Sequence, residues 1–488
     1  MSEVTKAQLT HGRQRIVLAV CCMSLLIVSL DNTALNVALP SMRRELDASV
    51  AGLQWTIDAY TLVLASLLML AGSTADRIGR RRVFTTGLVL FALGSLLCSL
   101  APSLETLVAF RMVQAVGGSM LNPVAMSIIT NTFTEPAARA RAIGVWGGVV
   151  GVSMAAGPLV GGLLVESVGW RAIFWVNLPV GLVALLLTLR YVPESRAPRP
   201  RRPDPVGQVL VAALLGSLTY AIIESSVLFA GVAALALAGL LLYEPRRREP
   251  LIDLRFFRSA PFSGATVIAV CAFAALGGFL FLNTLYLQDV RGLSALHAGL
   301  FMLPMAAMTF VFAPLSGRLV GTRGPRPSLL LAGTAMAAGP LLLAAFQAET
   351  STPLLLTGYV VFGIGFGLVN APITNTAVSG MPRAQAGVAA AVASTSRQIG
   401  QTLGVAVAGA VLTAGMGSTA YGAGGAGHPE GFVDASGPVY WIITGCGLCV
   451  LLAGALTSGA WARRTAERTA RLLEGADGLQ AAARAPSS

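Results

Sequence analysis

Three charged residues, Asp31, Asp58 and Arg111, lie inside stretches that are otherwise apolar enough to cross a membrane. A charged side chain at the centre of a membrane-spanning helix costs about 2.5–3.5 kcal/mol on insertion scales, so such residues usually face a wet cavity or a charged partner. At 1.5 Å of rise per residue, each of the three lies about 11–13 Å from the predicted outer end of its helix. The sequence therefore predicts a network of charges at one depth.

A carboxyl group in such a network could carry protons. A neighbouring guanidinium favours the ionised carboxylate, whereas desolvation favours the neutral acid. A group balanced between these effects can load a proton on one side of the membrane and release it on the other. We therefore assign proton coupling to Asp31, Asp58 and Arg111, with Asp31 as the first candidate. A static acid–arginine pair that only joins helices is the alternative.

The composition places the whole chain in a membrane. Of its 488 residues, 55% are hydrophobic and only 11% are charged, with a mean hydropathy of +0.72. Soluble domains are about 25% charged, and no polar stretch here is long enough to enclose a core of its own. The first apolar run has the length of a full span, which exceeds the apolar core of a cleavable signal peptide. The predicted class is an all-α integral membrane protein.

Apolar runs of about 20 residues predict fourteen membrane-spanning helices. Their expected limits are 16–39, 49–74, 83–100, 104–131, 140–165, 173–190, 206–223, 226–243, 262–287, 295–320, 328–346, 353–379, 384–414 and 438–462. The count of fourteen rather than twelve depends on the pair 206–223 and 226–243, which are short and separated by a tight turn.

The distribution of basic residues predicts the topology. With the N-terminus placed inside, 28 of the 34 Lys and Arg residues fall on the inner side and 4 on the outer side. Arg111 and Arg397 lie within spans. The positive-inside rule then puts both termini in the cytoplasm of a multi-pass cell-membrane protein. The net charge of +12 is thus a topology signal and does not indicate nucleic-acid binding.

An internal repeat predicts two homologous halves. The stretch from Gly72 to Arg82 returns in degraded form from Gly317 to Pro327, an offset of 245 residues. Paired halves with a binding site near the midplane between them are the usual layout of secondary transporters. The predicted parts are a first six-helix bundle (1–192), a linker with two extra helices (193–258), a second six-helix bundle (259–462) and a cytoplasmic tail (463–488).

Two motifs contain glycines with a structural purpose. The turn between the second and third spans holds a candidate cytoplasmic gate of Gly72, Asp76, Arg77, Gly79 and Arg80. Its glycines let the helix ends approach, and its acid can pair with a nearby arginine or cap a neighbouring helix. Such contacts could form when the cytoplasmic side closes and break when it opens.

The second motif lies in the fifth span and consists of Gly157, Pro158, Gly161 and Gly162. The proline removes a backbone hydrogen bond and bends the helix, while the glycines, together with Gly144, present a smooth face for close packing. An ordinary contact between small residues would explain the glycines but not the proline.

The chain resembles the major facilitator superfamily and, within it, the fourteen-helix drug:proton antiporter family. The resemblance covers nearly the whole chain, in the segments LDNTALNVALP, GSTADRIGRRRVF, RMVQAVGG, GPLVGG, WRAIFWVNLPVG, AGLFMLP and STSRQIGQTLGVAVAGAV. It departs from the family pattern at Thr74, Ala115 and Ser153. Gly321 stands opposite Asp76 in the second half, so gating is expected to depend mainly on the first half.

The resemblance implies the major facilitator fold of two six-helix bundles, here with two extra helices. It also implies a proton-coupled secondary transporter that exports amphipathic drugs or antibiotics by alternating access. In that family the GPLVGG motif marks exporters, and an acid in the second span can attract cationic drugs, so Asp58 either couples protons or binds a cationic substrate. A dedicated exporter of a self-made antibiotic or another metabolite is the alternative.

The expected partners are a small-molecule substrate, protons and the lipid bilayer, and the chain is expected to work as a monomer without a cofactor, a metal or a nucleic acid. An enzyme is disfavoured because the only histidines, His11, His297 and His428, lie at segment ends away from a second catalytic group. Further polar residues are weak candidates for the substrate cavity, since packing hydrogen bonds are their commoner use. They are Gln114, Asn283, Tyr286, Asn370, Asn375 and Arg397.

Overall fold

The computed structural model describes residues 11–197, 204–247, 250–344, 350–379, 381, 385–416 and 429–482, and its regular structure there is entirely helical. Fourteen helical segments in these ranges are long and apolar enough to cross a membrane, which confirms the predicted class and the predicted count. Two of the fourteen are broken: α4 and α5 form one span, and α7 and α8 form another.

The helices are, in chain order, α1 His11–Leu46, α2 Val50–Ile78, α3 Arg80–Ser99, α4 Leu104–Ser119, α5 Asn122–Thr132, α6 Pro136–Ser167, α7 Ala172–Trp175, α8 Asn177–Tyr191, α9 Pro205–Ile223, α10 Val227–Tyr243, α11 Ala260–Leu285, α12 Ala295–Arg323, α13 Pro325–Leu343, α14 Thr352–Val378, α15 Ala386–Met416, α16 Pro429–Thr457 and α17 Ala460–Ala482. Short 3-10 helices occur at η1 Glu244–Arg246 and η2 Leu254–Arg258, and a π-helical turn, η3, at Tyr286–Val290.

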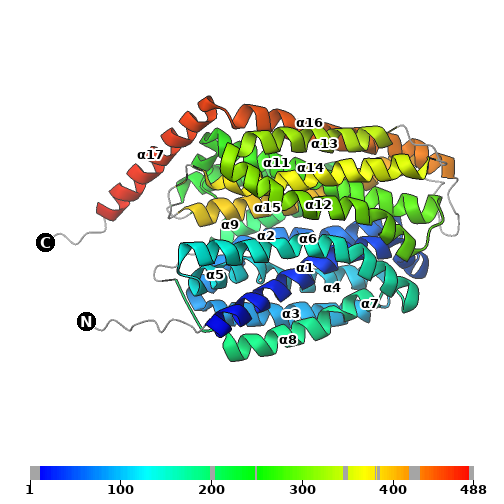
Figure 1. Ribbon diagram of the computed structural model, residues 1–488, viewed down its shortest axis with the longest axis horizontal. Helices are drawn as coiled ribbons and strands as arrows, with labels where there is room; N and C mark the ends of the chain where they lie inside the picture. The colour runs from blue at the N-terminus through cyan, green and yellow to red at the C-terminus, as the bar shows by residue number, and fades with distance from the viewer. Residues whose placement is uncertain are drawn as a thin grey trace.

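The helices group into two bundles (Figure 1). Helices α1 to α8 pack on one another and form the N-terminal bundle, while α11 to α16 form the C-terminal bundle. The extra pair, α9 and α10, pack together, and α9 also contacts α2 of one bundle and α15 of the other. This grouping follows the predicted division, whose boundaries stay a prediction; linker residues 198–203 lie outside the described ranges.

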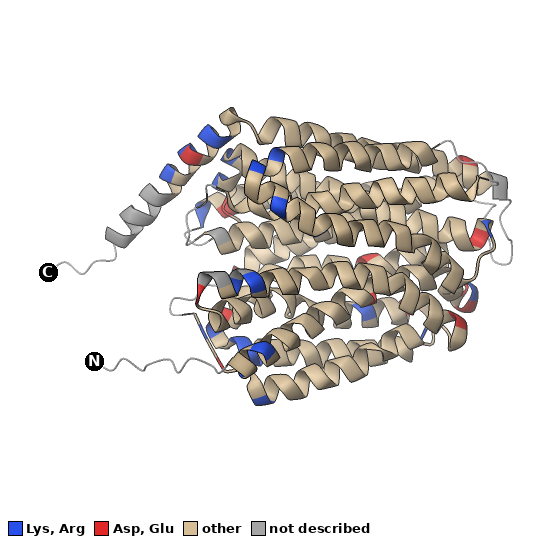
Figure 2. Cartoon of the chain, viewed as in Figure 1, with Lys and Arg blue, Asp and Glu red and all other residues tan. Residues whose placement is uncertain are grey.

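The two ends of the bundles differ in charge. Helix α1 begins and α16 ends at the same end of the molecule (Figure 1), which we call the basic end. Charged residues gather at the helix ends and are sparse between them (Figure 2). We call the opposite end the far end. That the basic end faces the cytoplasm stays a prediction.

Each of the two repeated turns contains a glycine with a positive φ. Gly79 links α2 to α3 with a φ of 129°, and Gly324 links α12 to α13 with a φ of 80°. The two glycines are 245 residues apart, the offset of the sequence repeat. Because glycine alone adopts positive φ without a steric penalty, this local match explains why the repeat keeps a glycine at both turns.

Two helix limits that differ from the predicted ones lie near prolines. The predicted span 104–131 is interrupted at Met120, since Pro123 in the first turn of α5 cannot donate a backbone hydrogen bond. Helix α1 instead continues through Pro40 to Leu46, past the predicted limit at Leu39. A helix packed among other helices tolerates such a proline because neighbouring groups satisfy the freed carbonyl.

The bundles meet in the half of the molecule near the far end. A Cβ atom at Gly162 of α6 would lie 2.7 Å from the carbonyl oxygen of Ala295, and one at Gly299 of α12 would lie 2.3 Å from the carbonyl oxygen of Pro158. Toward the basic end, glycines of both helices have no neighbouring atom within 4 Å of a Cβ position; these are Gly144, Gly147, Gly148, Gly317 and Gly321. The bundles are therefore closed at the far end and parted along α6 and α12 toward the basic end.

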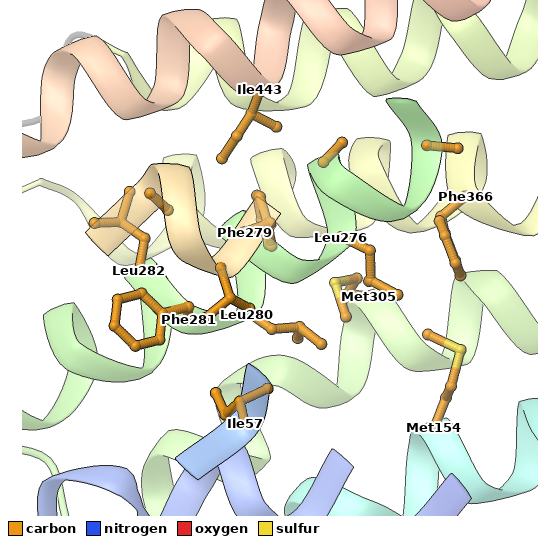
Figure 3. Close-up of a cluster of buried hydrophobic side chains, with 14 of the residues drawn as sticks. Ile57, Met154, Leu276, Phe279, Leu280, Phe281, Leu282, Met305, Phe366 and Ile443 are labelled. Carbon is orange, nitrogen blue, oxygen red and sulfur yellow. The ribbon is translucent and has the colours of Figure 1, made fainter. Parts of the chain in front are cut away.

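Apolar side chains fill the closed part of the seam. Figure 3 shows Ile57 of α2 and Met154 of α6 in one cluster with Leu280 of α11 and Met305 of α12. All four are at most 7% exposed. In the described ranges an ion pair between Arg43 of α1 and Asp289 of η3, at 3.1 Å, also joins the bundles near the far end. The apolar surface itself can separate when the bundles move.

Candidate functional site: two buried carboxylates

Asp31 of α1 lies at the centre of a polar network inside the N-terminal bundle. Its carboxylate accepts hydrogen bonds from Arg111 Nη1 at 2.5 Å, Gln114 Nε2 at 2.9 Å and Asn177 Nδ2 at 2.8 Å. Asp31 and Arg111 are both fully buried. A buried ion pair is tolerated when further hydrogen bonds satisfy its remaining lone pairs, and the two amides do so here.

The partners of Asp31 are themselves held in place. Ser95 Oγ of α3 accepts hydrogen bonds from Gln114 Nε2 at 2.7 Å and from Asn177 Nδ2 at 3.1 Å. Arg111 Nε donates to the carbonyl oxygen of Thr56 of α2 at 3.3 Å, and its guanidinium lies 4.2 Å from the centroid of the Tyr60 ring. The network thus ties together α1, α2, α3, α4 and α8, all in one bundle.

Local sequence explains why these groups meet. Arg111 and Gln114 are three residues apart on α4 and share one helix face. A Cβ atom at Gly94 would lie 2.5 Å from Gln114 Cα, and one at Gly117 would lie 2.3 Å from the backbone nitrogen of Phe91. The absence of both side chains lets α3 and α4 approach closely enough for Ser95 to reach Gln114.

Asp58 of α2 has a different environment. It is fully buried, and in the described part of the chain neither of its carboxylate oxygens has a hydrogen-bond partner. On the same helix face, Thr61 Oγ1 lies 2.6 Å from Thr402 Oγ1 of α15, and Gln54 Nε2 donates to the carbonyl oxygen of Ala406 at 2.7 Å. Since residues three and four apart share a helix face, Asp58 lies in the seam between the bundles.

The structure therefore brings together two of the three predicted network members. Asp31 and Arg111 are in direct contact, whereas no described hydrogen bond or ion pair connects Asp58 to either. The sequence placed the three at one depth but could not show which way each helix face points.

The predicted gate motif forms a pinned turn at the basic end. Arg80 donates to Asp76 Oδ1 through Nε at 3.1 Å and Nη2 at 2.8 Å, so the acid pairs within its own motif. Glu194, from the segment after α8, accepts hydrogen bonds from the backbone nitrogens of Arg81 at 3.1 Å and Arg82 at 3.3 Å. A Cβ atom at Gly79 would lie 2.6 Å from the Glu194 carboxylate. Glycine is required there both for its φ and for this contact.

The segment after α8 also binds to the turn through its backbone. Arg80 N donates to the carbonyl oxygen of Ser195, and Ala197 N donates to that of Asp76. The other two gate positions are less constrained. Arg77 is exposed, and a Cβ atom at Gly72 would have its nearest neighbour, Pro123 Cβ, at 3.8 Å.

The GPLVGG motif of α6 packs on a helix from each bundle. A Cβ atom at Gly157 would overlap Thr33 Oγ1 of α1, and one at Gly161 would lie 2.9 Å from the carbonyl oxygen of Ala34. On the other side, Gly162 and Pro158 contact α12. Gly144 has open space around it, so the close-packed glycine face does not extend that far, because α6 and α12 have parted there.

The weak cavity candidates separate into three places. Gln114 belongs to the Asp31 network. Asn283 is buried in the C-terminal bundle, where its Oδ1 accepts hydrogen bonds from Tyr359 at 2.8 Å and Tyr440 at 2.9 Å, and Tyr286 is buried as well. These groups have the packing contacts that polar side chains inside a bundle commonly make.

The third group lies on α14 and α15. Arg397 Nη2 donates to Thr374 Oγ1 at 2.5 Å and to the carbonyl oxygen of Asn370 at 3.5 Å. Asn370 and Arg397 are partly exposed and Asn375 is exposed. Of the six candidates, these three are the ones that are not buried.

Sequence reasoning missed Ser95, Asn177 and Glu194. Asn177 stood within the segment WRAIFWVNLPVG, and its position at the start of α8, inside an apolar span, was an available signal. Ser95 and Glu194 had none, because a serine in an apolar helix and an acid in a charged linker are both common.

Comparison with known proteins gives a family. The sequence pattern described as Major Facilitator Superfamily matches residues 21–405. The chain is 38% identical over 415 residues to the Multidrug resistance protein Stp of Mycobacterium tuberculosis, covering 83% of this chain and 77% of that protein. It is 37% identical over 424 residues to the Tetracenomycin C resistance and export protein of Streptomyces glaucescens, covering 85% and 78%.

Among solved structures, the chain resembles a bacterial homologue of the human lysosomal transporter Spinster in an inward-facing and unoccupied conformation. The TM-score is 0.62 with 20% sequence identity, and the match covers 94% of this chain and 99% of that one. At this identity the likeness shows a shared fold.

Proposed function

Because the chain belongs to the Major Facilitator Superfamily, we propose that it is a secondary active transporter that exports amphipathic drugs or antibiotics in exchange for protons. The names of its relatives support export of such compounds. Proton coupling is supported by Asp58, a fully buried carboxyl group in the seam between the two bundles that has no hydrogen-bond partner among the described residues.

Protonation of Asp58 gives a physical reason for the seam to open and close. A buried carboxylate without a donor or a cation is strongly disfavoured, so the closed seam suits the neutral acid. When the far end opens, water reaches Asp58, a bound cationic substrate can leave, and a proton from that side can replace it. A cationic substrate that enters from the basic end would in turn displace this proton toward the basic end. The ionised group then opposes closure until a proton or a cationic substrate neutralises it. A proton and a cation thus compete for one carboxylate.

Asp31 and Arg111 have a complementary part in this proposal. Three donors stabilise the Asp31 carboxylate, and the network fixes α1, α4 and α8 as one body. Arg111 also reaches the backbone of α2 at Thr56, two residues before Asp58. A displacement of α2 would therefore move a hydrogen-bond acceptor of Arg111 and so change the Asp31–Arg111 pair. A membrane potential of 100 mV supplies about 2.3 kcal/mol per transported proton to drive such steps.

At the basic end, the turn at Gly79 acts as the gate in this proposal. Asp76, Arg80 and Glu194 hold the turn rigid within the N-terminal bundle. The equivalent turn of the C-terminal bundle has Gly321 in place of the acid. We propose that the basic end faces the cytoplasm, that the gate closes against the C-terminal bundle, and that one chain suffices for transport.

The second candidate is a dedicated exporter of an antibiotic made by the same cell. The specific support is the 37% identity to a protein named for tetracenomycin C resistance and export. The two functions differ in the number of compounds exported.

A drug-susceptibility panel in a host without its own pumps tests the proposal. Expression should raise the inhibitory concentration of several unrelated amphipathic compounds, and adding such a compound to inverted vesicles should release protons from an acidified interior. Protection against one compound alone would favour the dedicated exporter. Export without any proton movement would contradict the coupling.

A further inference from the structure

Gln54 of α2 contacts α15 across the seam through its side-chain amide, as Gln288 of η3 contacts α1 by donating to the carbonyl oxygen of Val37 at 2.8 Å. Gln54 is 1% exposed, and its Nε2 donates to two backbone carbonyl oxygens of α15, those of Val405 at 3.1 Å and Ala406 at 2.7 Å. A helix carbonyl can accept a second hydrogen bond because its oxygen has two lone pairs. The amide therefore binds to α15 without breaking that helix.

Gly409 makes room for this amide. It lies one turn after Val405, and a Cβ atom there would lie 2.3 Å from Gln54 Cδ and 2.5 Å from Nε2. Any other residue at this position would force the amide out of place, because these distances are far below contact distance. The side-chain amide of Gln54 thus fills the space that the missing side chain of Gly409 leaves on α15.

The position of this contact matters for Asp58. Helix α2 begins at Val50 at the far end, so Gln54 lies between that end and Asp58, which is one turn further along. Thr61 and Thr402 meet on the next turn toward the basic end. Water that enters from the far end along this face must pass Gln54 before it reaches Asp58.

Helix α9 covers the same seam from its lipid side. Leu215 and Thr219 of α9 line a small gap together with Leu62 of α2 and Thr402 of α15. Gln208 of α9 donates to the carbonyl oxygen of Ser66 of α2. With the lipid side covered by α9 and the basic-end side closed by the contact between Thr61 and Thr402, the far end is the route by which water can reach Asp58 along this face when Gln54 releases.

We propose that Gln54 and Gly409 form a latch that holds the far end of the α2–α15 seam closed and keeps Asp58 dry. Gln54 is a positioning residue, because it acts through α15 and touches no transported ion in the closed state. The latch is one part of the far-end gate of the proposed exporter, together with the apolar cluster, so the importance of the latch for export rests on the proposed function. The effect of the latch on the equilibrium between the closed and the open far end does not depend on what the protein transports.

A neutral latch suits repeated opening. An uncharged amide that leaves two carbonyls can rebond to water, and the carbonyls keep their own helical hydrogen bonds. Breaking a buried ion pair in the same place would leave uncompensated charges and would slow the opening. The seam thus combines two weak neutral contacts, at Gln54 and at Thr61, on either side of one titratable group.

Hydrogen–deuterium exchange of the full chain in lipid nanodiscs tests the latch with Gly409→Ala. Backbone amides near the far end, in 50–61 and 402–412, should exchange about tenfold faster, because two buried hydrogen bonds and close packing are lost. Amides at the basic end, in 138–150 and 311–323, should exchange more slowly, since the bundles close there when they open at the far end. A merely structural defect would not produce changes of opposite sign.

Two further variants and a control make the result decisive. Gln54→Ala should give the same pair of opposite changes, and it removes only a side chain, so it answers the question even if Gly409→Ala does not fold. The double variant should match Gln54→Ala, because the two residues act through one contact. Gly387→Ala is the matched control: it lies on the same helix, exposed, with no atom within 4 Å of its Cβ position, and should leave exchange unchanged.

Faster exchange at the far end without slower exchange at the basic end, in both Gly409→Ala and Gln54→Ala, would overturn the latch. So would additive effects in the double variant. The measurement needs neither a substrate nor a proton gradient, so it separates failure of the latch from failure of the proposed function. Loss of proton-coupled export in the wild-type chain would leave the exchange result standing.

Discussion

Asp31 and Asp58 are both fully buried acids of the N-terminal bundle, yet their surroundings are opposite. Asp31 accepts three hydrogen bonds, one of them from a guanidinium, and every partner belongs to its own bundle. Asp58 has no partner in the described chain and lies against α15 of the other bundle. Burial alone therefore does not define a role for an acid in a membrane.

The difference concerns what happens when the bundles move. The partners of Asp31 move with it, so its surroundings change little between conformations. The neighbours of Asp58 across the seam leave when the far end opens, so its surroundings change from dry to wet. A group whose protonation is to follow conformation needs the second arrangement, while a group that fixes helices needs the first.

The largest effect is expected for Asp31→Asn. This change leaves Arg111 without a counter-charge inside the bundle, which typically costs about 3–5 kcal/mol of stability. The protein should still reach the membrane, but with a lower unfolding temperature in detergent and with export driven by a pH gradient at background. Thermal unfolding and dye efflux from vesicles measure the two effects. Unchanged efflux would remove Asp31 from proton coupling.

The double variant Asp31→Asn, Arg111→Gln sharpens that result. Removal of both charges should recover most of the lost stability, because no uncompensated charge remains. If export stays at background while stability returns, the pair is required for coupling. If stability and export both return, the pair only joins helices, and proton coupling would be assigned to Asp58 alone.

Asp58→Asn should separate function from stability. The amide is a neutral isostere of the protonated acid, so the unfolding temperature should stay within the range of the wild-type protein. Export of cationic substrates against a pH gradient should fall at least about tenfold, which corresponds to about 1.4 kcal/mol, and fall more than that of neutral substrates. Equal loss for both kinds of substrate would assign Asp58 to coupling in general. A large loss of stability would contradict the dry, neutral environment.

The third effect is a pH dependence of the conformation. The closed far end is expected to hold Asp58 protonated and the open far end to expose it to water, so the closed state binds more protons. Rising pH should then shift the equilibrium toward the open far end, because the state with fewer bound protons gains. Hydrogen exchange of 50–61, corrected for the intrinsic pH effect with an unstructured peptide, measures this shift. Asp58→Asn should abolish it, whereas retention of the shift in that variant would point to another group.

The smallest effect is expected at the hydroxyl contact of the seam. Thr61→Val leaves Thr402 with an unsatisfied hydroxyl and should weaken the closed far end by about 1 kcal/mol, seen as severalfold faster exchange of 402–412. Thr61→Val with Thr402→Val should restore exchange nearly to wild type, since both polar groups are then gone. If the double variant is worse than the single one, the hydroxyls do more than satisfy each other.

The sequence by itself determined the class and much of the layout. Apolar runs gave fourteen spans because a lipid environment forces every span to be a long apolar helix, a constraint readable from composition. The repeat offset of 245 residues found the two turns at Gly79 and Gly324, since positive φ requires glycine at each. The costly charges Asp31, Asp58 and Arg111 were visible for the same reason.

Only the tertiary structure decided how those charges are divided. The direction in which a helix face points depends on packing against neighbours distant in sequence. Asp31 meets Asn177, 146 positions away, and Asp58 faces a helix more than 300 positions away. Depth along a helix is a local quantity that spacing predicts, but rotation about the helix axis is set by the whole bundle. For that reason the sequence could place two acids at one level and not tell that one is fixed within a bundle while the other lies in the moving seam.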